Sequence, residues 1–150
     1  MVDNENVARL LKKVWICDGV ISSAAFNLRP QIHETYISVL RECVGTFALD
    51  IKKICKELPV DYALMPINSV KSLKIVSIED DIKFSVKAVD NATIKSHAGI
   101  FITINEQQLV GGEPFESLEI KRGKSADCVL LEIRKSIAKL ASRNIKSFEG

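Results

Sequence analysis

The residues that suggest chemistry gather in one stretch, residues 15–41, which reads WICDGVISSAAFNLRPQIHETYISVLR. Its polar residues follow neither the helical nor the strand period, and Gly19 and Pro30 interrupt it. This is typical of a polar loop embedded in a fold, where binding residues concentrate. The polar members are Asp18, Ser22, Ser23, Asn27, Arg29, His33, Glu34 and Arg41. Turn and capping bonds account for Ser22, Ser23 and Asn27.

Arg29 and Arg41 stand among aromatic and aliphatic neighbours. A guanidinium in such surroundings either pairs with a carboxylate or binds an anionic ligand. We expect an internal ion pair with Asp18 or Glu34 first, and an anionic ligand as the alternative. Arg29, Arg41 and Glu34 are therefore candidate ligand-binding residues.

The two histidines are the remaining candidates for ligand binding or acid-base chemistry. His33 stands beside Glu34, but neighbouring residues on a strand point to opposite faces, so they need not act as a pair. His97 directly precedes an apolar run. At such a position one ring nitrogen can form a hydrogen bond to a turn while the other binds a ligand. We expect His97 to lie near Arg29 if the 15–41 stretch is a binding site.

No complete reaction signature accompanies these residues. Ser22 and Ser23 lack the Gly-x-Ser-x-Gly elbow, and Gly111-Gly112 lacks the further glycines of a nucleotide-binding loop. The residue pattern thus favours a noncatalytic binding or accessory protein that uses the polar loop over 18–41 as its contact surface. The alternative is a small enzyme for an anionic, nucleotide-like substrate, with Arg29 and Arg41 as charge clamp and His33 or His97 as acid-base.

Composition places the chain among globular proteins of one domain. Its 150 residues are 47% hydrophobic and 27% charged, with a net charge of +2. The four cysteines stand far apart and only two histidines accompany them, so we expect neither a metal nor a cofactor. The N-terminus has no apolar signal region and no run long enough to span a membrane, so we expect a cytoplasmic protein without membrane contact.

The charge is unevenly distributed along the chain. Residues 121–150 hold 8 Lys or Arg against 3 Asp or Glu, while residues 1–120 hold 13 against 16. No aromatic residues interleave with this basic tail, which argues against nucleic acid as a partner. The partners we expect instead are an anionic small molecule, another protein, or a second copy through the last helix or a sheet edge.

Periodicity predicts the elements that position these residues. Apolar stripes at helical spacing predict helices over 4–14, 46–58 and 126–145. Strict alternation predicts a strand over 82–88, flanked by strands over 73–78 and 98–104, and shorter strands are expected over 36–40 and 107–110. We therefore expect an α+β fold in which an antiparallel sheet of three or more strands is covered on one face by the three helices.

Three segments together resemble a small bacterial protein family whose function is unassigned. They are ISSAAFNLR and ETYISVLR, with HAGI downstream, and they cover about a third of the chain. The resemblance rests on Ser22, Ser23, Phe26, Arg29, Glu34, Ser38, Val39, His97 and Ala98. It implies a shared fold and little about activity.

Overall fold

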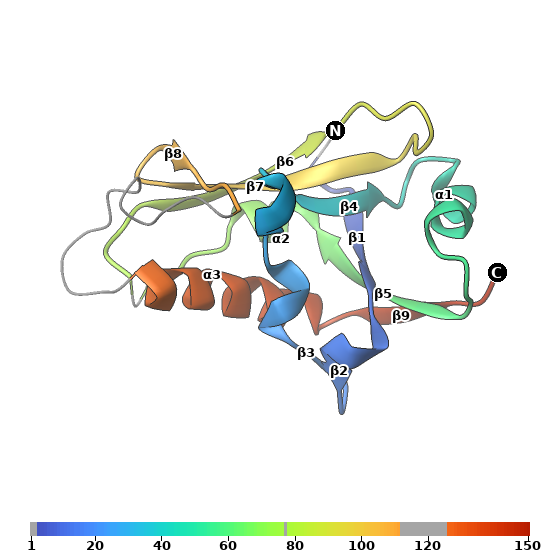
Figure 1. The fold of residues 1–150 in the computed structure, drawn as a ribbon, viewed down its shortest axis with the longest axis horizontal. Helices are drawn as coiled ribbons and strands as arrows, with labels where there is room; N and C mark the ends of the chain where they lie inside the picture. Colours follow the sequence, from blue (N-terminus) through green and yellow to red (C-terminus); the bar gives the residue numbers. More distant parts are fainter. Residues whose placement is uncertain (1–2, 77, 112–125) are drawn as a thin grey trace.

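The computed structural model describes residues 3–76, 78–111 and 126–150. Its main feature is one seven-stranded antiparallel sheet in the order β6-β7-β4-β1-β5-β9, with β8 also paired to β7 (Figure 1). The strands are β1 Asn6–Leu11, β4 Ile37–Arg41, β5 Val60–Pro66, β6 Ile82–Ala88, β7 His97–Ile104, β8 Gln107–Gln108 and β9 Ile145–Phe148. The predicted α+β fold with an antiparallel sheet is confirmed.

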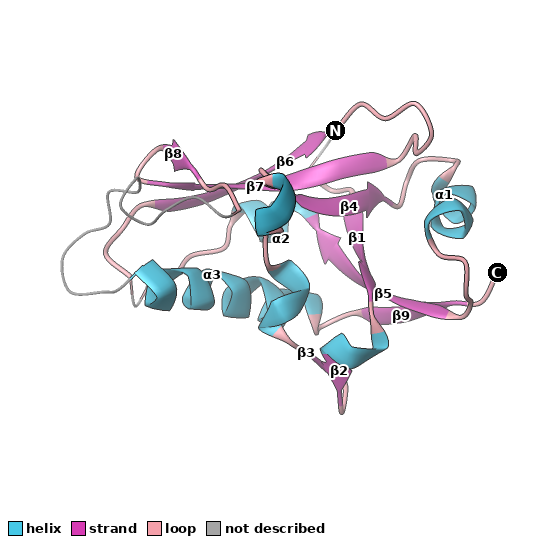
Figure 2. Ribbon diagram, in the orientation of Figure 1, coloured by secondary structure: helices cyan, strands magenta, loops and turns pink. Residues whose placement is uncertain are grey.

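Three α-helices accompany the sheet in the described ranges: α1 Phe47–Ile54, α2 Ile67–Lys71 and α3 Ala126–Ala141 (Figure 2). Three short 3-10 turns, η1 Lys13–Trp15, η2 Ser23–Phe26 and η3 Pro30–Ile32, follow β1 and precede β4. A second, two-stranded sheet joins β2 Ile16–Cys17 to β3 Val20–Ile21. None of the described helices has the length and apolarity needed to cross a membrane.

The two faces of the sheet pack differently. On one face, side chains from five strands form the main core with buried residues of α2, α3 and η2, among them Val70, Ile137 and Phe26. The other face holds a smaller cluster in which Phe47 of α1 packs against Ala8 and Tyr62. Successive residues of a strand point to opposite faces, so each strand contributes to both.

The predicted helix over 4–14 is wrong, because β1 occupies its centre. β1 lies between β4 and β5, where both faces of the sheet are covered, so Val7, Ala8 and Leu11 are all buried. A strand buried on both faces loses the alternation that marks a half-exposed strand. Its apolar residues therefore matched a helical period by coincidence, and Val14, the last of that stripe, is 86% exposed.

The other two predicted helices are shorter than expected. The helix predicted over 46–58 ends at Ile54, because the chain leaves the helical conformation before Pro59 and enters β5 at Val60. It also packs on the opposite face from α2 and α3, so the predicted single helical layer is wrong. The helix predicted over 126–145 ends at Ala141, because residues from Ile145 pair with β5 as strand β9.

The strands predicted over 36–40, 82–88 and 98–104 are confirmed, while β5 and β9 were not predicted. β4, β6 and β7 match the predicted strands over 36–40, 82–88 and 98–104 within one residue. The strand predicted over 73–78 is absent among its described residues, and that over 107–110 is reduced to the two residues of β8. β5 was not predicted, because four consecutive buried residues hide its period. Of the Gly111-Gly112 pair, Gly112 lies outside the described residues.

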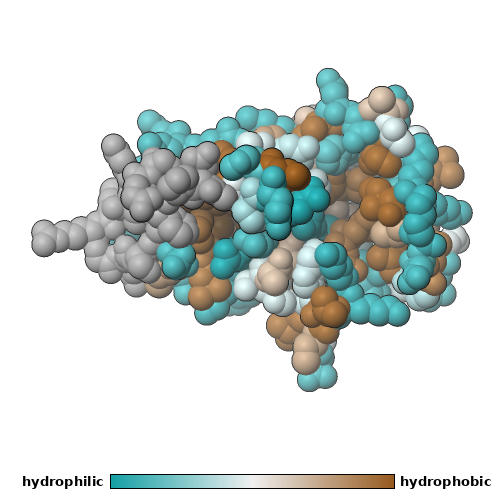
Figure 3. Space-filling model, in the orientation of Figure 1, coloured by the Kyte–Doolittle hydropathy of each residue, from teal (hydrophilic) through white to brown (hydrophobic). Residues whose placement is uncertain are grey.

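The β2–β3 hairpin projects from the body of the molecule and carries apolar residues (Figure 3). Val20 is 62% exposed at this hairpin, while Ile21 beside it is buried. Ile21 N donates a 3.0 Å hydrogen bond to Ser142 Oγ, directly after the end of α3. The hairpin is thus anchored at its base and exposed at its tip.

Val7 and Val14 both belong to the apolar stripe that predicted a helix over 4–14, and substituting each of them tests whether this segment is a strand or a helix. We expect Val7→Ala to lower the free energy of unfolding by about 2 kcal/mol, because it removes two methyl groups from a fully buried side chain. Val14→Ala is the matched control and should change it by less than about 0.5 kcal/mol. Urea unfolding measures both. Equal losses would indicate that the two side chains share one buried face, as in a helix.

Candidate functional site

The polar stretch over 18–41 contains a capped 3-10 turn, η2, directly after the β2–β3 hairpin. Ser22 Oγ accepts a 3.2 Å hydrogen bond from Ala24 N at the start of η2. The turn directs Ala25 and Phe26 into the core, where Phe26 is 1% exposed. The capping use expected for Ser22 is confirmed.

Arg29 and Glu34 form the ion pair that we expected first. Arg29 Nε and Nη2 lie 3.2 and 3.0 Å from Glu34 Oε2, and Arg29 N donates to Glu34 Oε1 at 3.0 Å. Both carboxylate oxygens are thus used to close the loop around η3. The Arg29 side chain is 64% exposed, whereas that of Glu34 is only 9% exposed. Glu34 is therefore the buried partner of the pair, and Arg29 lies at the surface.

Arg41 is also paired, but with a carboxylate that the local sequence did not suggest. Its Nε and Nη2 donate to Glu5 Oε2 and Oε1 at 3.1 and 3.0 Å, a bidentate bond between β4 and the residue preceding β1. The hydrogen bond to Glu5 raises the pKa of Arg41. The expected partners, Asp18 and Glu34, are not used.

The two histidines lie in different surroundings. His33 is exposed and adopts a left-handed backbone conformation with φ +46° at the end of η3. His97 is half-buried at the start of β7, where its Nε2 lies 3.3 Å from Ser38 Oγ. Its Nδ1 is buried and has no hydrogen-bond partner among the described residues. Burial accordingly lowers the pKa of His97, which favours the neutral ring at neutral pH.

The five candidate residues do not line one common cavity. Of the two main cavities, one is lined by His97 and the other by none of the five. Arg29, His33 and Glu34 precede β4, whereas Arg41 ends that strand and lies beside the start of β7 through Arg41 N and Ser96 O. The acid-base and charge-clamp arrangement of the enzyme hypothesis is therefore not assembled. That each residue binds a ligand stays a prediction.

Arg9 is a charged residue on the core face of the sheet, and no sequence pattern marked it as a candidate site residue. It lies on β1, where its Nε donates to Ala25 O at 3.0 Å and its Nη1 donates to Ser38 O at 2.8 Å. Its guanidinium also lies 5.6 Å from the centre of the Trp15 ring. Desolvation lowers the pKa of Arg9 to about 10, partly offset by the charge of Glu34. Arg9 thus holds η2 against β4 as a charged group at neutral pH.

A buried carboxylate fixes the start of β7. Asp50 of α1 is fully buried, and its Oδ2 accepts hydrogen bonds from Ser96 Oγ, Ser96 N and Thr46 Oγ1 at 2.6, 2.9 and 2.9 Å. Burial alone would raise the pKa of Asp50, but the hydrogen bonds from Ser96 and Thr46 lower it overall. The residue next to Ser96 is His97, so this network positions the histidine. No signal in the sequence distinguishes Asp50 from a surface carboxylate on a helix.

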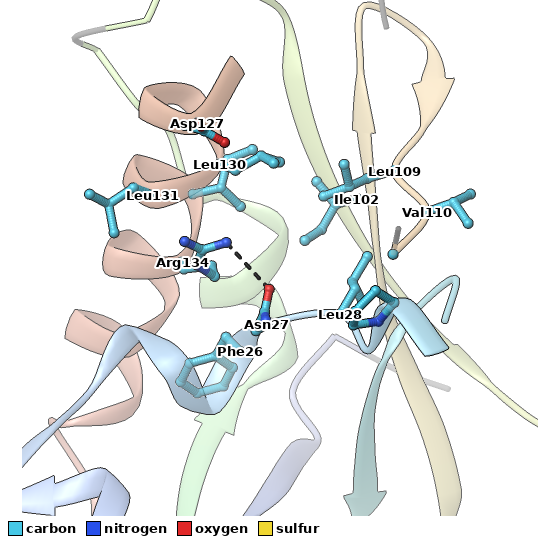
Figure 4. A pocket seen from close by; sticks show the side chains of 13 residues that line it. Phe26, Asn27, Leu28, Ile102, Leu109, Val110, Asp127, Leu130, Leu131 and Arg134 are labelled. Carbon is cyan, nitrogen blue, oxygen red and sulfur yellow. Dashed lines mark hydrogen bonds between the residues drawn. The ribbon is translucent and has the colours of Figure 1, made fainter. Parts of the chain in front are cut away.

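The larger cavity lies between α3, residues 26–30 and strand β7, with a volume of about 500 Å³ (Figure 4). This volume is within the usual range for a small-molecule site. Most of the described lining residues are apolar: Phe26, Leu28, Pro30, Ile102, Leu109, Val110, Leu130, Leu131 and Ile133. Residues 26–30 belong to the polar stretch, which supplies one wall through its apolar members.

A few polar side chains face this cavity. Arg134 Nη1 donates to Asn27 Oδ1 at 3.3 Å, and Figure 4 shows the guanidinium pointing toward the asparagine across the cavity. Asp127 lies two turns earlier on α3. In the sequence Arg134 is one of eight basic residues over 121–150, so only the tertiary structure distinguishes it.

Comparison with known proteins identifies no relative. No protein-family model matches the chain, and neither a curated protein nor a solved structure matches it. The resemblance to the small bacterial family stays a prediction. In the described part of the chain, no group of three or more His, Cys, Asp or Glu side chains is placed to hold a metal ion.

The role of Arg9 predicts a large effect from a substitution without charge. Arg9→Met keeps the length of the side chain but leaves Ala25 O and Ser38 O without their donor, so we expect a loss of about 2–3 kcal/mol in the free energy of unfolding. Lys13→Met, an exposed cation shortly after the same strand, should change it by less than about 0.5 kcal/mol. Urea unfolding tests both, and an Arg9→Met protein as stable as wild type would contradict this role.

The lowered pKa of His97 predicts a loss of stability on mild acidification. Above pH 6.5 the ring is neutral in the folded and the unfolded chain, so it adds no pH dependence. Below pH 6.5 the unfolded chain binds the proton first, and stability falls until the folded-state pKa is passed. Urea unfolding at about pH 7.5 and about pH 5.5 should show a smaller loss for His97→Gln than for wild type. Equal losses in wild type and His97→Gln would refute the assignment.

Proposed function

We propose that the protein is a noncatalytic binding protein for a small amphipathic anion. The observation that carries the proposal is the cavity of about 500 Å³ between α3 and residues 26–30, with apolar walls and one arginine. Apolar walls with a few convergent polar groups are the usual composition of a ligand site. The proposal also agrees with the expectation that the polar stretch forms a contact surface.

The walls favour an apolar ligand body. Leu28, Ile102 and Leu109 lie across the cavity from Leu130 on α3 (Figure 4). Each square ångström of apolar surface removed from water contributes about 25 cal/mol. A ligand with a ring or a short aliphatic chain would therefore gain most of its affinity here.

Arg134 favours an anionic group at one end of that ligand. Its guanidinium has five N–H donors in a planar fork, and Asn27 Oδ1 is the one described side-chain acceptor that it bonds. A carboxylate, sulfonate or phosphate can accept two of the remaining donors. Asp127 would repel an anion, so the charged end should lie at Arg134 and the apolar body should extend toward Leu130.

The ionisable groups of the cavity favour binding over catalysis. Asp127 and Arg134 are the two ionisable residues among its described lining residues. Arginine stays protonated at neutral pH and does not exchange protons as a general base. Asp127 alone therefore lacks the partner that acid-base or nucleophilic catalysis needs.

We place this binding function in the cytosol. Cys17, Cys43, Cys55 and Cys128 are free, and Cys17 and Cys43 are exposed. Exposed free thiols are stable in a reducing compartment and are oxidised outside it.

Titration with 1-anilinonaphthalene-8-sulfonate tests the proposal, because this fluorescent probe combines aromatic rings with one sulfonate. Arg134→Gln should weaken binding about tenfold by removing the charged donor, and Leu130→Trp should abolish it by filling the cavity. Lys139→Gln, an exposed cation on the same helix, is the control and should bind as wild type.

Thermal unfolding of each variant separates loss of the site from loss of the fold, since this probe also binds partly unfolded proteins. Binding that Leu130→Trp leaves intact, in a folded protein, would show that the probe lies elsewhere. The absence of any binding to the wild type would refute an amphipathic-anion site.

A further inference from the structure

The sheet face opposite α3 carries an aromatic cluster near the ends of β4 and β7. The Tyr36 ring lies 5.7 Å from the His97 ring and 5.2 Å from the Phe101 ring, measured between ring centres. Tyr36 and Phe101 are both half-buried, so part of each ring contacts solvent. We call these three residues the aromatic face.

Gly99 explains how the Tyr36 ring comes to lie against the sheet. A Cβ at this position would meet Cδ2, Cγ and Cβ of Tyr36 at 2.6, 2.7 and 2.9 Å. Any other residue would lift the ring away from the strand. Gly99 stands between His97 and Phe101 on the same side of β7, so its missing side chain leaves the space that Tyr36 fills.

Lysines of β6 border the aromatic face. Lys87 Nζ lies 5.2 Å from the centre of the Phe101 ring, and Lys87 forms no salt bridge with a described residue. Lys83 lies on the same side of β6, about 13 Å away along the strand. Its Nζ is 3.6 Å from Asp81 Oδ2, so its charge is partly neutralised.

The smaller cavity, of about 300 Å³, adjoins the aromatic face at His97. Its polar lining residues are Arg9, Ser38, Asn91 and His97, and the other six are apolar. Asn91 Oδ1 accepts from Thr93 N and Ile94 N, which leaves its Nδ2 group as a donor.

We propose that this face binds single-stranded nucleic acid. Planar side chains on an open antiparallel sheet stack bases, and a nearby cation contacts the phosphates. Tyr36 and Phe101 would stack bases of a short segment, and Lys87 would contact its backbone. A base beyond Tyr36 would enter the smaller cavity beside Ser38 and Asn91. The site lies on the opposite sheet face from the cavity of the proposed function and does not depend on it.

The sequence pointed away from this partner because no aromatic residues interleave with its basic tail. Here Tyr36 directly precedes β4, while Phe101 lies on β7 and Lys87 on β6. Pairing of β6 with β7, and of β7 with β4, brings the three together. None of these three residues belongs to the basic segment over 121–150.

Fluorescence anisotropy tests the proposal, with a labelled oligonucleotide of about ten nucleotides as single-stranded RNA and DNA, and a duplex for comparison. Phe101→Leu keeps an apolar side chain on the strand but removes the ring, and should weaken binding about tenfold. Lys87→Gln, at an exposed position, should also weaken binding and should reduce the salt dependence by about one counterion. Lys139→Gln on α3 is the control and should bind as wild type.

Three results would overturn the proposal. They are the absence of binding at about 50 mM salt, equal affinity of wild type and both variants, and an equal loss in the Lys139→Gln control. Equal affinity for a mononucleotide and the oligonucleotide would also overturn the proposal and would indicate a site for a single nucleotide. Because Lys87 is exposed, Lys87→Gln tests the surface even if Phe101→Leu lowers the stability of the sheet.

Discussion

The architecture around the larger cavity depends on the guanidinium of Arg9. A charged group on the core face of a sheet is costly unless hydrogen bonds satisfy it. Arg9 meets this condition with two backbone carbonyls, one in η2 and one in β4. It therefore joins the polar stretch to the sheet at the point where Phe26 enters the core and Asn27 turns toward α3.

How much of this fold is readable in the sequence depends on which strands have a solvent-exposed face. β6 alternates because Lys83, Ser85 and Lys87 lie opposite its core residues, and it was predicted to the residue. β1 and β5 are central strands with little exposed surface, so their periods were misread or hidden. β9 was absorbed into the helix before it, because Ile145 happens to continue the helical stripe of α3.

The site was predictable only where its contacts are local. The bond between Arg29 and Glu34 joins residues five positions apart, and the sequence suggested it. The bond between Arg41 and Glu5 requires the residue before β1 to lie beside β4, which no local pattern specifies. The cavity combines α3, residues 26–30 and β7, so its existence follows from packing and not from a motif.

The sheet order also constrains how the chain assembles. β1 is made before either of its neighbours, and it pairs with β4 and β5 only after about thirty and about fifty further residues have followed. Until then the N–H and C=O groups along both edges of β1 are unpaired, as in an edge strand. Because β1 is made before both of its neighbours, its protection from aggregation depends on pairing that comes only when β4 and β5 have been synthesised.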